Sequence, residues 1–191
     1  GHWRKRLRHQ LPFTPTKAQE DALQEIEADM NSPNRMLRLL QGDVGSGKTA
    51  VGFMAMIHAI GSSGQTVLMA PTEILARQHE KNISVFAQKL GLTVVTLSGR
   101  DKGKARDKLL EMMASGEAHI IIGTHALFQE DVTFKDLAFV IIDEQHRFGV
   151  HQRLQLSEKG NLCDVLVMTA TPIPRTLTLT VYGDMDVSRL T

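Results

Sequence analysis

Eight consecutive residues in the first third of the chain have the types and spacing needed to bind phosphate. They fit the pattern G-x-x-x-x-G-K-[ST] at every fixed position and are Gly42, Asp43, Val44, Gly45, Ser46, Gly47, Lys48 and Thr49. Small residues let the backbone turn tightly and point several N–H groups inward, which makes a nest for a β-phosphate. Lys48 can reach the β- and γ-phosphates as a point charge, and the Thr49 hydroxyl can ligate Mg²⁺. This stretch predicts a phosphate-binding loop.

The flanks of this loop have the character that such a loop requires. Residues 36–40 are mostly apolar and predict a strand that enters the loop, and residues 50–57 predict a buried helix that leaves it. A glycine-rich turn that matched the pattern by chance would need neither flank.

Two adjacent carboxylates, Asp143 and Glu144, directly follow an apolar run over residues 139–142. An Asp at the tip of a buried strand can hold Mg²⁺ opposite Thr49, often through water, because a hard cation prefers oxygen ligands. Glu144 can polarise the attacking water, which hydrolysis requires and nucleotide storage does not. The alternative is an acidic N-cap for the following helix, which would leave the phosphate loop without its metal partner. The candidate catalytic residues are therefore Lys48, Asp143 and Glu144.

Three further polar positions have both a structural and a functional interpretation. Gln19 fits a capping box with Thr16, or its amide pairs with the adenine edge, which needs both a donor and an acceptor. His146 is either a capping or core histidine or a relay from the γ-phosphate. Thr169 and Thr171 either begin a capped helix with prolines near its first turn, or sense the nucleotide state beside the acidic cluster.

The elements that must position these residues alternate along the chain. Short apolar runs predict strands over residues 36–40, 66–70, 93–97, 119–123, 139–142 and 165–169, with helical patterns between most of them. Continuously apolar strands that alternate with helices imply a parallel sheet covered on both faces. Ligands gather at the carboxyl ends of the strands in such sheets, and nearly every polar cluster follows a predicted strand. We therefore expect one α/β domain with one active edge.

Composition excludes several other classes of protein. The chain has 191 residues, 42% hydrophobic and 23% charged, with a net charge of +1, so any surface that attracts nucleic acid must be local. Its single cysteine, Cys163, cannot form an internal disulfide and suits a reducing cytoplasm. No apolar run approaches the roughly 20 residues of a membrane span, and no signal peptide is evident. The basic run over residues 3–8 is either a solvated linker or a nucleic-acid contact.

The motifs together resemble those of a superfamily 2 helicase. The phosphate loop, Pro-Thr-Glu at residues 71–73, Asp-Glu-x-His at 143–146 and Thr-Ala-Thr at 169–171 occur in that family's order, from Gln19 to Arg175. Residues 123–127, 143–150 and 169–177 are similar to bacterial helicases that act on branched DNA. Transcription-repair coupling factors share the Arg-Phe-Gly-Val continuation, but they usually carry Glu where this chain has Gln145.

The resemblance implies a three-layer P-loop (RecA-like) α/β fold with a mostly parallel central sheet and helices on both faces. It implies a tag remnant or linker over residues 1–12, a first motor domain over 13–183, and over 184–191 the start of a linker to a second RecA-like lobe. That lobe would supply the arginine that completes the ATP site, and an amino-terminal wedge domain would recognise the branch point. The implied activity is remodelling of stalled forks and Holliday junctions in the bacterial cytoplasm, with ATP and Mg²⁺ as cofactors.

The resemblance also implies roles for residues along the active edge. The residues expected to couple the nucleotide site to DNA binding are His146, Arg147, Thr169, Thr171 and Arg175. Contacts to the DNA backbone fall to Pro71, Thr72, Arg77, Arg100, Thr124 and His125. Hydroxyls, backbone N–H groups and arginines suit phosphate contacts, which position the protein without reading sequence, although any one arginine can be a plain surface charge.

Two classes of function remain open from the sequence. One is a DNA-dependent ATPase motor, and the other is a nucleotide-responsive DNA-binding module without significant hydrolysis of its own. In either case we expect the chain alone to bind nucleotide weakly, to turn over negligibly and to unwind nothing, because it lacks the partner arginine.

Overall fold

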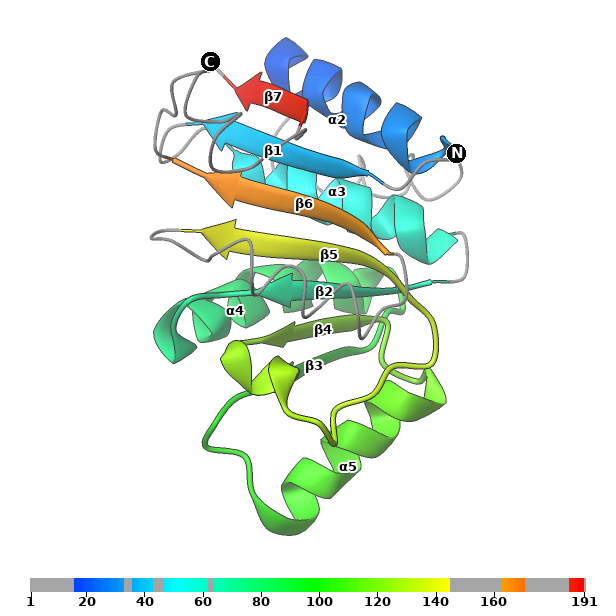
Figure 1. Ribbon diagram of the computed structural model, residues 1–191, viewed down its shortest axis with the longest axis vertical. Coiled ribbons are helices and arrows are strands. Elements are labelled where there is room, and N and C mark those ends of the chain that lie inside the picture. The colour runs from blue at the N-terminus through cyan, green and yellow to red at the C-terminus, as the bar shows by residue number, and fades with distance from the viewer. Residues whose placement is uncertain are drawn as a thin grey trace.

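The chain folds as a seven-stranded parallel sheet with helices packed on both faces (Figure 1). The computed structural model describes residues 16–32, 36–42, 47–61, 64–144, 163–170 and 186–190. The strands are β1 (Leu37–Gly42), β2 (Gln65–Met69), β3 (Val94–Leu97), β4 (Ile120–Gly123), β5 (Leu137–Glu144), β6 (Asp164–Thr169) and β7 (Asp186–Leu190). The helices are α2 (Lys17–Met30), α3 (Lys48–Gly61), α4 (Glu73–Lys89), α5 (Gly103–Ser115) and the 3₁₀ helix η1 (His125–Phe128). The predicted three-layer α/β fold is confirmed.

The strand order is β3-β4-β2-β5-β6-β1-β7, and every described pair is parallel. All carboxyl ends therefore lie at one edge of the sheet, as the arrowheads in Figure 1 show. Six of the seven strands match the six runs predicted from the sequence, within two residues at each end.

Alternating side chains of the strands fill two separate cores. Leu40, Ile141 and Met168 belong to the core beneath α2, α3 and α4. Their neighbours along the strands, such as Leu39 and Ile142, belong to the core on the α5 face, which also buries Cys163. Both faces of the sheet are covered, which explains why the strands are apolar throughout. Across the described residues, no helix has the length and apolar character needed to cross a bilayer.

Side chains at the helix starts satisfy backbone N–H groups that have no partner within the helix. At α2, the Thr16 hydroxyl accepts from the Gln19 N–H at 3.2 Å, and the Gln19 side chain accepts from the Thr16 N–H at 2.9 Å. At α4, the Thr72 hydroxyl accepts from the Leu75 N–H at 3.2 Å. The predicted capping box is confirmed, and Thr72 is the N-cap of α4.

The last strand, β7, lies in a stretch for which the sequence predicted no strand. Residues 186–190, within the range 184–191 that was expected to begin a linker, pair in parallel with β1 at the edge of the sheet, and the domain boundaries stay a prediction. Ser188, in the middle of β7, is buried. The run has only two apolar residues, Val187 and Leu190, so its strand character depends on the partners that cover it.

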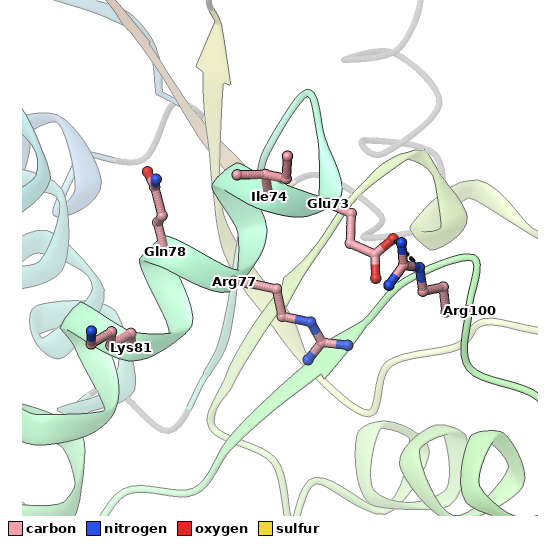
Figure 2. A pocket seen from close by; sticks show the side chains of 6 residues that line it. All are labelled: Glu73, Ile74, Arg77, Gln78, Lys81 and Arg100. Atoms are coloured by element: carbon pink, nitrogen blue, oxygen red, sulfur yellow. Dashed lines mark ion pairs between the residues drawn. The ribbon is translucent and has the colours of Figure 1, made fainter.

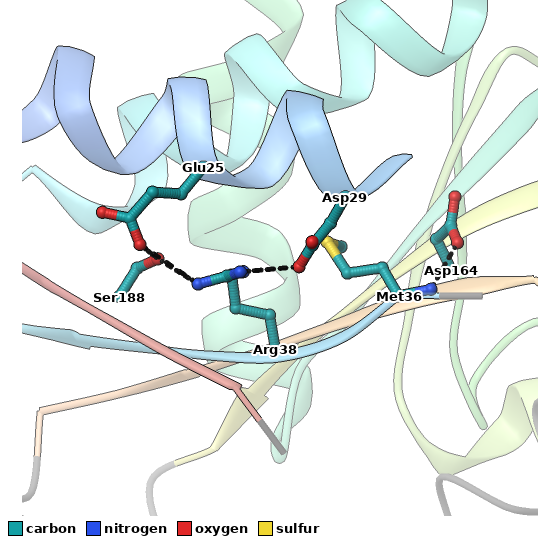
Figure 3. A network of polar contacts seen from close by, with 6 residues as sticks. All are labelled: Glu25, Asp29, Met36, Arg38, Asp164 and Ser188. Atoms are coloured by element: carbon teal, nitrogen blue, oxygen red, sulfur yellow. Dashed lines mark hydrogen bonds and ion pairs between the residues drawn. The ribbon is translucent and has the colours of Figure 1, made fainter. Parts of the chain in front are cut away.

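Arg38 joins β7 to the rest of the domain (Figure 3). The Arg38 guanidinium donates to Asp29 at 2.6 Å and to Glu25 at 3.1 Å on α2, and to the Ser188 hydroxyl at 2.9 Å on β7. The Ser188 hydroxyl in turn donates to Glu25 at 2.9 Å. A buried arginine requires such partners, because an unpaired buried charge is costly. The network thus attaches β7 to α2 through a side chain of β1.

Candidate nucleotide-binding site

Both ends of the predicted phosphate loop lie where strand, loop and helix should meet. Gly42 is the last residue of β1, Gly47 directly precedes α3, and Lys48 is the first residue of that helix. The Lys48 ammonium donates to the Gly42 carbonyl oxygen at 2.6 Å, so the lysine reaches back across the loop. Residues Asp43, Val44, Gly45 and Ser46 of the predicted loop lie outside the described residues.

Gly47 occupies a position that only glycine fits. Its φ is +86°, in the left-handed region that L side chains rarely adopt. A Cβ at this position would lie 1.8 Å from Nε2 of Gln19. The Gln19 amide therefore lies directly over the end of the loop while its oxygen caps α2. The cap interpretation of Gln19 is confirmed, and its contact with adenine stays a prediction.

The packing of α3 places Thr49 and Asp143 on facing surfaces. A Cβ on Gly52 would lie 3.1 Å from Cδ1 of Ile141 and 3.3 Å from Sδ of Met168, so α3 is pressed against β5 and β6. Thr49 lies one turn before Gly52 on the same side of α3. Asp143 lies two residues after Ile141 and so on the same side of β5.

This arrangement fits a bound Mg²⁺ ion. A hydroxyl and a carboxylate are both hard oxygen donors, and Mg²⁺ usually takes only one or two protein ligands beside phosphates and water. Thr49 and Asp143 would hold the ion, and no larger cluster of protein ligands is required of such a site.

His79 of α4 is a site residue that the sequence analysis did not single out. Its Nε2 lies 2.7 Å from Oδ2 of Asp143, with the two side chains 10% and 17% exposed. His79 shares the buried face of α4 with Ala76 and Ile83. The sequence did offer one signal for this residue, a histidine at an apolar position of a helix. Its partner, Asp143 on β5, is 64 residues away, so the pair could not be predicted from neighbouring residues.

The remaining polar positions near the phosphate loop follow β5 and β6. In the sheet register, Thr169 pairs with Glu144 on one side and with Gln41 of β1 on the other. Thr169 is buried, 3% exposed. The predicted coupling residues His146, Arg147, Thr171 and Arg175 lie outside the described residues.

The predicted DNA contacts occupy the other half of the same edge. Pro71 and Thr72 follow β2, Thr124 and His125 follow β4, and Arg100 follows β3 closely. Because β2, β4 and β3 are neighbours in the sheet, these residues come together. The Thr124 hydroxyl caps η1 by accepting from the Ala126 N–H at 3.4 Å, as the Thr72 hydroxyl caps α4.

A surface pocket lies between α4 and the end of β3 (Figure 2), lined by Glu73, Ile74, Arg77, Gln78, Lys81 and Arg100. Arg77 and Arg100 both extend into it. Arg100 pairs with Glu73 at 3.2 Å, and Arg77 pairs with Glu80 at 3.0 Å. Exposed ion pairs of this kind contribute little, so both guanidinium groups can exchange a carboxylate for a phosphate.

A parallel α/β sheet with a glycine-rich loop before α3 and an Asp at the tip of β5 defines a P-loop nucleotide-binding domain. The family model of the DEAD/DEAH box helicases matches residues 16–180. The chain belongs to this family, and the resemblance to superfamily 2 helicases is confirmed.

The more similar relatives support the narrower resemblance. The ATP-dependent DNA helicase RecG of Pasteurella multocida is 56% identical over 189 residues, covering 97% of this chain and 27% of the relative. RecG of Bacillus subtilis is 58% identical over 178 residues, covering 93% and 26%. The chain thus spans about a quarter of the length of these relatives.

Solved structures agree on the fold. A structure of RecG bound to a three-way DNA junction matches with a TM-score of 0.83 and 44% identity, over 97% of this chain and 25% of that one. The DNA-bound helicase MrfA matches with a TM-score of 0.72 over 98% of this chain and 29% of that one, and at 16% identity it shares the fold alone.

Proposed function

We propose that the chain is the first motor lobe of an ATP-dependent DNA helicase that remodels branched DNA in recombination and repair. One observation carries the proposal. In the sheet order, the residues predicted to bind nucleotide follow β1, β6 and β5, and those predicted to contact DNA follow β2, β4 and β3; we call these the nucleotide half and the DNA half of the edge. A protein that only stored nucleotide would have no use for the second half.

On the nucleotide half, Lys48 holds the β- and γ-phosphates, while Thr49 and Asp143 hold Mg²⁺. Mg²⁺ bound between these two residues would supply positive charge beside the phosphates. Glu144 orients and deprotonates the attacking water. The Gln19 amide lies against Gly47, and we assign to Gln19 the contact with the adenine of the same nucleotide.

On the DNA half, hydroxyls and guanidinium groups contact the phosphate backbone without reading bases. The similarity to RecG, one structure of which holds a three-way junction, favours forks and junctions as the substrate and RecG over a coupling factor. A second lobe would supply the arginine that completes the ATP site, and a wedge domain would separate the strands. The second candidate function is a nucleotide-responsive DNA-binding module, and it applies only to the chain in the absence of a second lobe.

A chimera tests this proposal directly. This chain would replace the matching quarter of Bacillus subtilis RecG, and ATP hydrolysis and strand separation would be measured on a three-way junction. We expect junction-stimulated turnover and unwinding by the chimera, and neither by the chain alone. Brisk turnover by the isolated chain, or a folded chimera that binds ATP without hydrolysing it, would contradict the motor assignment.

The predicted DNA half can be tested by its salt dependence. Each of Arg77→Ala and Arg100→Ala should weaken binding of the chimera to a junction by about 5- to 10-fold at low salt, equally for different sequences, because a charged phosphate contact is lost. The slope of log K against log salt should fall by about one per arginine. Lys89→Ala, at the far end of α4, is the matched control and should leave the slope unchanged.

A further inference from the structure

A hydrogen bond joins Nε2 of His79 to Oδ2 of Asp143, and the role of the ring nitrogen depends on the histidine tautomer. The tautomer that carries its proton on Nε2 donates to the carboxylate, which as an anion only accepts. The distance of 2.7 Å and the burial of both side chains make this a charge-assisted bond in a place with little water. This bond uses Oδ2 of Asp143, so Oδ1 is the oxygen that a metal or its water would use.

Backbone geometry alone does not orient the Asp143 side chain. Asp143 is the second-last residue of β5, and a carboxylate at a strand end can rotate about both of its side-chain torsions. A metal ligand is usually oriented by a second group that hydrogen-bonds to it. His79 is placed to do so, because Ala76, Ile83 and Ala87 anchor its helix face in the core.

Helix α4, which carries His79, also lines the surface pocket that contains Arg77 and Arg100. Arg77 lies two residues before His79, hence on the opposite side of α4, and its side chain is 48% exposed. A DNA phosphate that binds to the exposed face of α4 therefore contacts the same helix that orients Asp143 through His79.

We propose that His79 is a positioning residue: it orients Asp143 for Mg²⁺ and connects the DNA-facing helix α4 to the metal site. The inference rests on the proposed nucleotide site. It adds a residue that touches neither nucleotide nor DNA and acts through Asp143.

The first test uses the 191-residue chain with the nonhydrolysable analogue AMP-PNP, titrated calorimetrically at several Mg²⁺ concentrations and in EDTA. His79→Leu removes the donor at similar volume. We expect the Mg²⁺ concentration for half-maximal binding to rise by about 10- to 100-fold, the usual effect of losing a group that orients a metal ligand. Affinity in EDTA should not change, because the phosphate loop is intact.

Two further variants separate positioning from general damage. His79→Gln, whose amide can donate at a similar reach, should restore most of the Mg²⁺ dependence. His58→Leu is the matched control, since it removes a partly buried histidine of α3 that bonds to Asn31; it should leave the Mg²⁺ dependence unchanged. Equal loss of affinity with and without Mg²⁺ in His79→Leu, or no loss at all, would overturn the positioning role. If neither the parent chain nor the chimera binds AMP-PNP, the proposed nucleotide site itself fails, and the inference fails with it.

The second test uses the chimera and compares hydrolysis with and without a three-way junction. If α4 connects the two halves, His79→Leu should lower the ratio of stimulated to basal turnover at saturating Mg²⁺, and His79→Gln should recover it. An unchanged ratio with lower absolute rates would overturn the connection to α4 and leave only the orientation of Asp143.

Discussion

Lys48→Ala should weaken binding of Mg²⁺-ATP to the chain by about 10- to 100-fold, which would take an already weak affinity out of calorimetric range. A hydrogen bond to a charged group contributes about 1.5–3 kcal/mol, and the Lys48 ammonium would make such bonds to two phosphates. The Lys48 ammonium donates to the Gly42 carbonyl oxygen at 2.6 Å, and this bond would be exchanged for bonds to the phosphates. Isothermal titration calorimetry of both proteins measures the effect.

The matched control for this prediction is Lys89→Ala, which removes the same charge from the last residue of α4 and should bind as the parent does. Saturable binding that persists unchanged in Lys48→Ala would mean that nucleotide binds away from the phosphate loop. Absence of binding to the parent would be followed by the same titration of the chimera, where recovery would show that the second lobe completes the site.

Glu144→Gln should abolish turnover while leaving nucleotide binding intact. A general base contributes about 10²- to 10⁴-fold to a rate, and the isosteric amide cannot take a proton from water. Lys48, Thr49 and Asp143 are untouched, so affinity for Mg²⁺-ATP should stay close to that of the parent. The junction-stimulated kcat of the chimera and the Kd for AMP-PNP together give the comparison.

Asp143→Asn serves as the contrasting variant, because the two neighbouring carboxylates are assigned different roles. Removing the charge of the metal ligand should raise the Mg²⁺ requirement and lower turnover, whereas Glu144→Gln should lower turnover alone. A Glu144→Gln chimera that hydrolyses ATP at the parent's rate would assign the base to another residue, and the acidic pair would then be explained as a helix cap.

Features whose chemistry depends on neighbours along the chain could be predicted from the amino-acid sequence. A phosphate loop needs a glycine, a lysine and a hydroxyl within eight residues, so its pattern is visible before any folding. The same holds for the capping box of Thr16 and Gln19 and for the six apolar strands, because periodicity and caps act over three to five residues. The adjacency of Asp143 and Glu144 belongs to this group as well.

Which of these features lie next to one another depends on the packing of the whole domain. The strand order places β6 and β5 beside β1, and it groups β2, β4 and β3 into a separate half of the edge; nothing in the local pattern specifies that order. The position of Gln19 over Gly47, the bond from His79 to Asp143 and the seventh strand all join residues far apart in the chain. β7 has only two apolar residues, Val187 and Leu190, and this pattern is too weak to predict a strand. The burial of β7 comes from its packing against α2 and β1. Contacts of this kind arise from packing, which no short stretch of sequence encodes.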